Sequence, residues 1–295
     1  MALSRLLIFT IGITTAVAAQ PLAERYAHLG DVYIQPLSSS PFPHPQRAAG
    51  HTYNNQSYPA EKHYSDSSVA IVVPRGFTPQ QKTDLVIYFH GWYNNIDSAC
   101  AQFRLIEQFC ESRKNAVFVF PEGPKNAPDS FGGRLEEKDG LQKLVNDVLM
   151  FLKQHNKIVI TNIGNIVLAG HSGAYRVISF CLMRGGLTRN ITDVVLFDAL
   201  YGQTEKYAYW IDRYKGRFIN IFTNDGGTRN ETENLMADLD GWGIPYLLKE
   251  ENDVTADDLK KQRLIFIHSE LAHNDVIASK NQFRDFLSTS ALHNN

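Results

Sequence analysis

The sequence predicts an α/β fold built on a mostly parallel sheet with helices on both faces. Short apolar runs rich in β-branched residues alternate along the chain with longer segments whose apolar residues recur at helical intervals. The short runs are continuously apolar, which is typical of parallel strands that helices cover on both sides. No linker or change of composition divides residues 51–295, so we expect one domain there.

The expected elements follow one another from residue 68 onwards. Strands are predicted at 68–74, 84–90, 116–120, 165–170, 193–198, 218–223 and 263–268. Helices are predicted at 99–113, 140–154, 174–184, 231–243 and 275–288. This alternation of strands and helices is the basis for the layered fold class.

The first nineteen residues are typical of a secretory signal peptide. Arg5 precedes an apolar run from Leu6 to about Val17, and small residues then allow cleavage after Ala18 or Ala19. The run is short for a membrane span of about 20 residues, so an N-terminal anchor is the weaker alternative. We therefore expect a secreted or periplasmic protein without a stable membrane span after cleavage. Residues 20–50, rich in Pro and Ser, are expected to form an extended lead-in.

Charge and cysteine content limit the possible partners. The formal net charge of -2 provides no basic field for nucleic acid. No Cys/His spacing indicates a zinc site, and we expect neither a metal nor a cofactor. Within one helix, Cys100 and Cys110 would lie about 15 Å apart, whereas a disulfide requires about 7 Å or less. A bridge between them needs Cys100 in a loop that folds back, and Cys181 falls on an apolar helical stripe.

The segment GHSGA, residues 170–174, points to a nucleophile. It follows a buried strand and precedes a helix, and the carboxyl ends of parallel strands are where such sheets carry their chemistry. A serine on this tight turn needs small residues two positions before and after it, as Gly170 and Ala174 provide. We expect Ser172 to be the nucleophile; the alternative is a serine that caps the helix.

A serine nucleophile needs a base and an orienting carboxylate. His273, in the loop after the last strand, is the expected base, while His268 at the strand end is expected to pack or hydrogen-bond locally. Asp225, in a glycine-rich loop after strand 218–223, is the expected acid. Asp198, at the end of the preceding strand, remains the alternative.

The backbone N–H groups of Gly173 and Trp92 are the expected oxyanion donors, since Gly91 lets the chain turn closely after strand 84–90. The long loop 121–140 is expected to reach the site, where Arg134 suits an anionic group unless it pairs with a surface Glu. Residues 199–217 leave room for one helix, whose aromatic residues either line a groove or pack on the sheet. The candidate substrate contacts are Gly91, Tyr93, His171, Phe131, Arg134 and Tyr201.

Taken together, FHGW, GHSGA, FTNDGG and LAHND resemble the motifs of the α/β-hydrolase family over residues 65–290 or so. The resemblance implies an eight-stranded sheet with an antiparallel first hairpin and metal-free acyl transfer, in the chain order Ser172, Asp225, His273. The short segment 199–217 leaves no room for a large cap domain. The expected function is an exported serine hydrolase that cleaves an ester in a small molecule or a polymer. A serine peptidase or amidase, or a non-catalytic binding protein on the same fold, are the alternatives.

Overall fold

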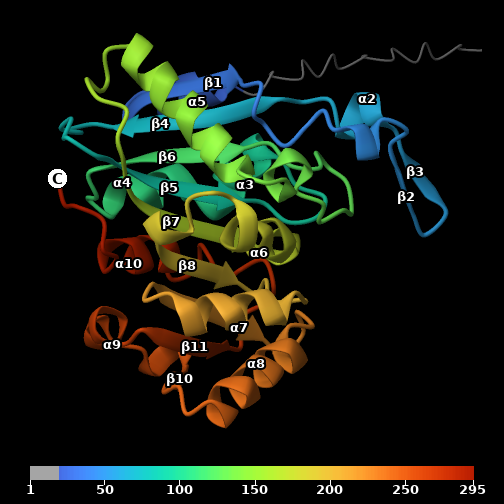
Figure 1. The fold of residues 1–295 in the computed structure, drawn as a ribbon, viewed down its shortest axis with the longest axis vertical. Coiled ribbons are helices and arrows are strands. Elements are labelled where there is room, and N and C mark those ends of the chain that lie inside the picture. The colour runs from blue at the N-terminus through green and yellow to red at the C-terminus, as the bar shows by residue number, and fades with distance from the viewer. Residues whose placement is uncertain (1–19) are drawn as a thin grey trace, which may run out of the picture.

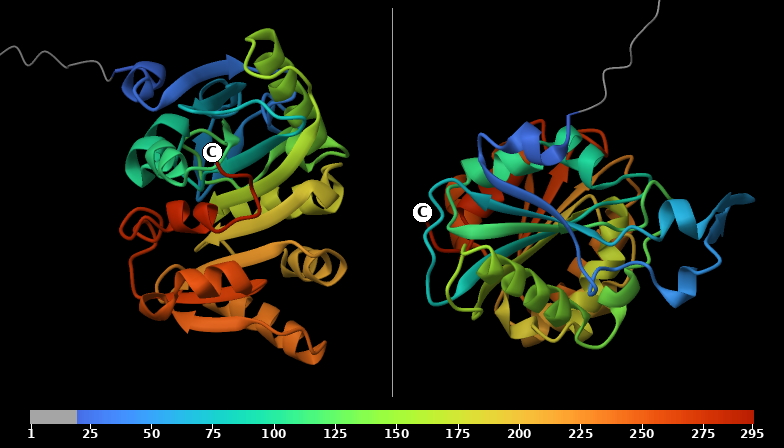
Figure 2. Two further views of the ribbon diagram at one scale, coloured as in Figure 1. Left: turned by 90° about the vertical axis from the view of Figure 1, so that its left-hand side faces the viewer. Right: turned by 90° about the horizontal axis from the view of Figure 1, so that it is seen from above.

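A computed structural model describes residues 20–295, so the expected signal peptide lies outside the described residues. A nine-stranded sheet crosses the molecule, and helices cover both of its faces (Figure 1 and Figure 2). Strand β4 pairs antiparallel with both neighbours, and the other pairs in this sheet are parallel. In spatial order the strands are β1 (Gly30–Pro36), β4 (Ser68–Pro74), β6 (Ala116–Pro121), β5 (Thr83–Phe89), β7 (Ile163–His171), β8 (Ile191–Phe197), β9 (Arg217–Thr223), β11 (Leu264–Ser269) and β10 (Leu247–Glu250). The predicted α/β class and antiparallel first hairpin are confirmed.

Two edge strands correct the sequence prediction. Strand β1 lies within residues 20–50 and pairs along its whole length with β4, and helix α1 (Leu22–Tyr26) precedes it. These residues are therefore part of the domain and not a lead-in to it. Strand β10 adds a ninth strand beside β11 where eight were expected. Its four residues are alternately exposed and half-buried, so it lacks the continuous apolar run that revealed the inner strands.

Side chains of the inner strands enter two separate cores. Along β5, Leu85 and Ile87 enter one core and Val86 and Tyr88 the other, because successive strand residues point to opposite faces. The first core is closed by α5 (Gly140–Gln154), α6 (Tyr175–Arg184), α7 (Thr204–Arg213) and α8 (Arg229–Gly241). The second is closed by α1, α3 (Ile96–Phe103), α4 (Leu105–Glu111), α9 (Ala256–Lys261) and α10 (Gln282–Ser288).

Two predicted helices differ from the observed ones. The helix expected at 99–113 is divided into α3 and α4 by Arg104, whose left-handed backbone (φ 52°) interrupts it. The closing helix begins at Gln282, seven residues later than predicted, after a series of turns. Cys100 and Cys110 therefore lie on separate helices, and these two cysteines and Cys181 are all free thiols.

Helix α7 is the single helix between β8 and β9, which confirms that no large cap is inserted there. Tyr207 and Trp210 are fully buried and Tyr214 packs partly against the same core, whereas Tyr209 is exposed. A different segment projects near the carboxyl ends of the strands: hairpin β2 (His51–Tyr53) and β3 (Gln56–Tyr58), followed by α2 (Ala60–His63) (Figure 1). No helix within residues 20–295 is both long enough and apolar enough to cross a bilayer.

Candidate active site

Ser172 lies on a strained turn between β7 and α6. Its φ is 55°, in the left-handed region that a residue with a side chain rarely adopts. The turn is crowded: a Cβ added at Gly170 would lie 2.5 Å from Ala174 Cβ, and one added at Gly91 would lie 2.5 Å from Ser172 Cβ. A larger side chain at Gly170 or Gly91 would therefore collide with its neighbours, as the sequence predicted for position 170. Backbone strain of the kind seen at Ser172 is concentrated at functional sites.

His273 lies in the loop after β11, and its partner is Asp198 rather than Asp225. His273 Nδ1 donates a hydrogen bond of 2.7 Å to Asp198 Oδ2. Asp198 is fully buried, whereas Asp225 is exposed on the surface. The prediction that Asp225 is the partner of His273 is therefore wrong. The alternative, Asp198 at the end of β8, contacts His273.

The loop that carries Asp225 forms the binding site for the Asp198 carboxylate. Oδ1 accepts bonds from the Thr223 N–H at 3.2 Å and from the Thr228 hydroxyl, and Oδ2 accepts from the Thr223 hydroxyl at 2.7 Å. A Cβ at Gly226 would lie 1.8 Å from Oδ2, so only glycine permits this approach. Burial alone raises the pKa of Asp198, but hydrogen bonds from His273 and the two threonines hold the pKa below its ordinary value. Asp198 is therefore ionised at neutral pH.

His171 fixes the loop that carries His273. Its Nε2 donates 2.9 Å to the backbone carbonyl of His273, and the two rings lie 4.5 Å apart. Burial, with the neighbouring His273 second, lowers the pKa of His171 to about 4, so the ring is neutral and keeps one N–H. His171 was expected to contact substrate; the structure instead buries it beneath His273.

The expected oxyanion donors lie beside Ser172. Gly173 lies in the helical turn Ser172–Ala174 that leads into α6, where unpaired N–H groups and the helix dipole favour negative charge. The Trp92 side chain covers Gly173, and its Nε1 donates 2.8 Å to Ser130 Oγ. Within residues 20–295, the Trp92 backbone N–H has no hydrogen-bond partner.

His90 determines the direction of the Trp92 N–H. Its Nδ1 donates 2.7 Å to the Gly91 carbonyl, and its Nε2 accepts 3.1 Å from the Gly123 N–H. The Gly91 C=O and the Trp92 N–H belong to one trans peptide and point in opposite directions. Holding the carbonyl on His90 therefore turns the Trp92 N–H the other way. The buried Glu122 lies 3.0 Å from His90 Nε2, but that nitrogen already accepts from Gly123, so we assign this contact no hydrogen bond.

No family model matches this sequence, and no curated protein matches it. Its structure is similar to that of a serine-to-alanine mutant of the feruloyl esterase module from Clostridium thermocellum complexed with sinapinate: 12% identity over 90% of this chain and 91% of that one, TM-score 0.54. A ferulic acid esterase matches at 12% identity over 75% of this chain and 91% of its own, TM-score 0.52. A fluorophosphonate-binding serine hydrolase from Staphylococcus aureus, substrate bound, matches at 10% identity over 77% and 93%, TM-score 0.50.

The chain has the α/β-hydrolase fold. The order of the strands along the sheet places β7, β8 and β11 so that their carboxyl ends carry Ser172, Asp198 and His273. Residues 20–295 contain no cluster of three His, Cys, Asp or Glu side chains arranged to hold a metal ion.

Two of the candidate substrate contacts have structural roles in this protein. Phe131 is buried against Phe42, and the Arg47 guanidinium lies 4.7 Å from the centre of its ring. Arg134 donates 3.2 Å to the Ser40 carbonyl and so holds the N-terminal segment, rather than a substrate anion or a glutamate. Loop 121–140 does reach the site, but through Ser130 and its contact with Trp92.

Tyr201 lies beside His273, Asp198 and Ser172. Its ring packs edge-on against His273, with ring centres 6.2 Å apart, and its hydroxyl donates to the Gly226 carbonyl. Burial and the Asp198 carboxylate raise the pKa of Tyr201. The nearby Ser172 hydroxyl lowers that pKa but does not cancel the rise. Tyr201 thus stays a neutral phenol within reach of Ser172. His268, as expected, bonds locally, to Glu250 at 2.8 Å and Asn224 at 3.0 Å.

An aromatic surface adjoins Ser172, formed by Tyr53, Trp92 and Tyr93. Trp92 and Tyr93 are 39% and 56% exposed, so both rings are accessible from solvent. Tyr53 comes from hairpin β2–β3 and packs edge-on against Trp92, with ring centres 5.1 Å apart. Tyr53 was not predicted from the sequence, because nothing in its local pattern indicates that the hairpin folds back onto the turn after β5.

Proposed function

We propose that this protein is an exported serine esterase whose catalytic triad is Ser172, His273 and Asp198. The observation that carries the proposal is the 2.7 Å hydrogen bond from His273 to the buried Asp198, beside a serine on a strained strand-to-helix turn. A buried, ionised carboxylate holds the imidazole proton on Nδ1 and leaves Nε2 able to accept a proton. The apolar N-terminal segment with its small-residue end supports export.

The proposed reaction has two halves. His273 takes the proton from the Ser172 hydroxyl, whose oxygen attacks the ester carbonyl carbon while the Gly173 and Trp92 N–H groups bind the resulting oxyanion. The carbonyl re-forms, the bond to the alcohol oxygen breaks, and His273 protonates the departing alcohol. Water, deprotonated by His273, then attacks the acyl-enzyme and releases the acid, and His273 returns its proton to Ser172. Asp198 remains ionised and stabilises the imidazolium in both halves.

We propose that the ester carries a planar aromatic group. The aromatic surface offers ring faces and edges next to the nucleophile, and rings of substrate and protein prefer such edge-on and offset contacts. Two proteins of similar fold are named as feruloyl and ferulic acid esterases, which agrees with this substrate class but, at 12% identity, speaks for the fold alone.

Labelling with a fluorophosphonate tests the nucleophile. We expect the wild-type protein and the control Ser65→Ala to be labelled at neutral pH, and Ser172→Ala to remain unlabelled. Absence of labelling in the wild type would overturn the proposal in favour of a binding protein. Faster cleavage of an arylamide than of the matching aryl ester would favour the peptidase or amidase alternative. Mass spectrometry of protein recovered outside the producing cell tests export, since a retained residue 1 would contradict signal cleavage.

A further inference from the structure

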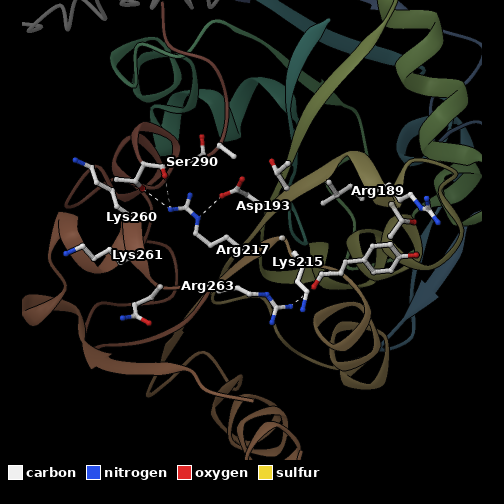
Figure 3. Close-up of a pocket in the computed structure, with 16 residues that line it drawn as sticks. Arg189, Asp193, Lys215, Arg217, Lys260, Lys261, Arg263 and Ser290 are labelled. Carbon is white, nitrogen blue, oxygen red and sulfur yellow. Dashed lines mark hydrogen bonds and ion pairs between the residues drawn. The ribbon is translucent and has the colours of Figure 1, made fainter. Parts of the chain in front are cut away.

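A groove of about 580 Å³ lies at the amino ends of β8, β9 and β11, opposite the strand ends that carry Ser172. Figure 3 shows the residues that line it. Its walls come from the segments that lead into β8, β9 and β11, whereas Ser172 follows the carboxyl end of β7. Strand β8 has seven residues and rises about 3.3 Å per residue, so roughly 20 Å separates the groove from the catalytic edge. A ligand in this groove therefore does not touch the reacting ester.

The groove is strongly cationic in a protein whose total charge is nearly balanced. The whole chain has 29 basic and 31 acidic residues, but this lining has one carboxylate, Asp193. The basic residues that line it are Arg189, Lys215, Arg217, Lys260, Lys261 and Arg263. Positive charge is thus concentrated here well beyond the average of the surface.

Neighbouring carboxylates leave most of this charge unpaired. Arg217 pairs with the buried Asp193 at 2.6 Å, and Lys261 pairs with Asp257 at 2.8 Å. Within residues 20–295, the other four basic side chains of the groove have no ion pair. The negative charge of Asp212 favours the charged form of Arg263, but Asp212 is paired with Arg213 at 2.9 Å and forms no ion pair with Arg263.

Hydrogen bonds hold two arginine side chains in the inner part of the groove. Arg217 donates 2.6 Å to the Leu259 carbonyl and 2.8 Å to the Phe286 carbonyl, in addition to its bond with Asp193. Arg263 donates to the carbonyls of Ile211 and Tyr214, and burial lowers the pKa of its guanidinium. Asp193 neutralises Arg217, whereas the bonds of Arg263 to neutral carbonyls fix its guanidinium without neutralising it, so the positive potential of Arg263 extends into the groove.

The exposed cations lie along both sides of the groove rather than at one point. Figure 3 shows Arg189 on one side and Lys260 and Lys261 on the other, with Arg217 and Asp193 between them. Cations spread in this way match a ligand that carries several anionic groups along its length. We infer that this groove binds an acidic polysaccharide, a chain of sugars with carboxylate or sulfate groups.

The remaining lining favours a polysaccharide over other polyanions. Gln262 offers its side-chain amide, and the hydroxyl oxygens of Thr188 and Ser290, whose protons go to the Leu182 and Leu287 carbonyls, can still accept from sugar hydroxyls. Single-stranded nucleic acid needs several aromatic side chains for its bases to stack on, and Tyr214 is the one aromatic residue of this lining. Anionic lipid headgroups also attract basic clusters, but this groove is concave and its lining has no exposed large apolar side chain to insert into a bilayer.

Binding of polygalacturonate, measured by fluorescence anisotropy, tests the inference with the full-length protein. We expect binding by the wild type that weakens with added salt, and none to the fully methyl-esterified, uncharged polymer. The triple variant Arg189→Ala, Lys215→Ala, Lys260→Ala is expected to bind at least about tenfold more weakly. Its control, Lys62→Ala, Lys82→Ala, Lys153→Ala, removes the same charge from exposed sites elsewhere and is expected to bind within about twofold of the wild type.

Other outcomes would overturn the inference. An equal loss of polygalacturonate affinity in the two triple variants would mean that total charge, not this groove, governs binding. Failure of the wild-type protein to bind polygalacturonate would exclude the site. Tighter binding to oligo(dT) or to vesicles containing phosphatidylglycerol would replace the polysaccharide with nucleic acid or membrane. Turnover of a nitrophenyl ester is expected to be the same in all three proteins, so the result does not depend on the esterase proposal.

Discussion

Replacing Asp198 by asparagine removes one charge from the proposed triad without changing the size of the side chain. Four hydrogen bonds end on its carboxylate, and every partner is a donor. The Thr223 N–H at Oδ1 is fixed by the backbone and cannot become an acceptor. The asparagine NH₂ group therefore takes the Oδ2 position, where the Thr223 hydroxyl can rotate and His273 can change tautomer.

This exchange places the proton of His273 on the wrong nitrogen. Opposite an NH₂ donor, Nδ1 must accept, so Nε2 carries the proton and cannot take one from Ser172. The same change in a serine protease triad lowers kcat about 10⁴-fold with the geometry intact. We expect Asp198→Asn to lower kcat by about 10³–10⁴-fold, or about 4–5.5 kcal/mol of transition-state stabilisation.

The assay is hydrolysis of a nitrophenyl ester at pH 7, with Asp225→Asn as the matched control. Asp225 is exposed, and within residues 20–295 its side chain makes no hydrogen bond, so this variant is expected to stay within about twofold of the wild type. Thermal unfolding confirms that both variants are folded. If Asp225→Asn abolishes turnover while Asp198→Asn keeps a tenth of it or more, the reasoning is refuted.

Three further substitutions test other contacts. His90→Ala releases the Gly91 carbonyl and with it the direction of the Trp92 N–H; we expect kcat to fall about 10²-fold with KM little changed, and an unchanged kcat would contradict this. His171 has a pKa of about 4 when folded, against an ordinary value of 6.5 for an exposed histidine, so the unfolded state binds the extra proton. Its contribution to stability is full above pH 6.5 and falls by about 3 kcal/mol as the pH drops to 4. Urea unfolding of His171→Asn should show a shallower pH dependence over that range, and equal slopes would refute it. Tyr53→Ala is expected to raise KM about 2–10-fold for an aryl ester but not for an acetyl ester, and an equal effect on both would argue against the aromatic surface.

Local sequence patterns were enough to predict the candidate nucleophile and base positions. Ser172 lies between two small residues at a strand-to-helix junction, and the close approach of Gly170 to Ala174 shows why those residues must be small. His273 follows the last inner strand, so its position along the chain already placed it at the carboxyl edge. The turn around Ser172 and the position of His273 after a strand both depend on residues a few positions away. A single sequence is therefore enough to predict them.

The choice between Asp198 and Asp225 depended on contacts between strands. Both residues follow a strand at the same edge of the sheet, so periodicity could not separate them. The loop after β9 folds back over the end of β8, and Gly226 lets it approach the Asp198 carboxylate closely. The loop that carries Asp225 therefore serves to bind the Asp198 carboxylate.

The sequence by itself determined the α/β class, the inner strands and the site around Ser172, because continuous apolar runs and tight turns are local properties. Only the tertiary structure decided that β1 and β10 join the sheet as its edges, since short or half-exposed strands carry a weak pattern. It also decided which aspartate His273 contacts and that six basic residues from distant segments share one groove. Those features arise where segments far apart in the chain meet. The hydrogen bonds and packing contacts that stabilise them join different segments, so the sequence of any one segment does not predict them.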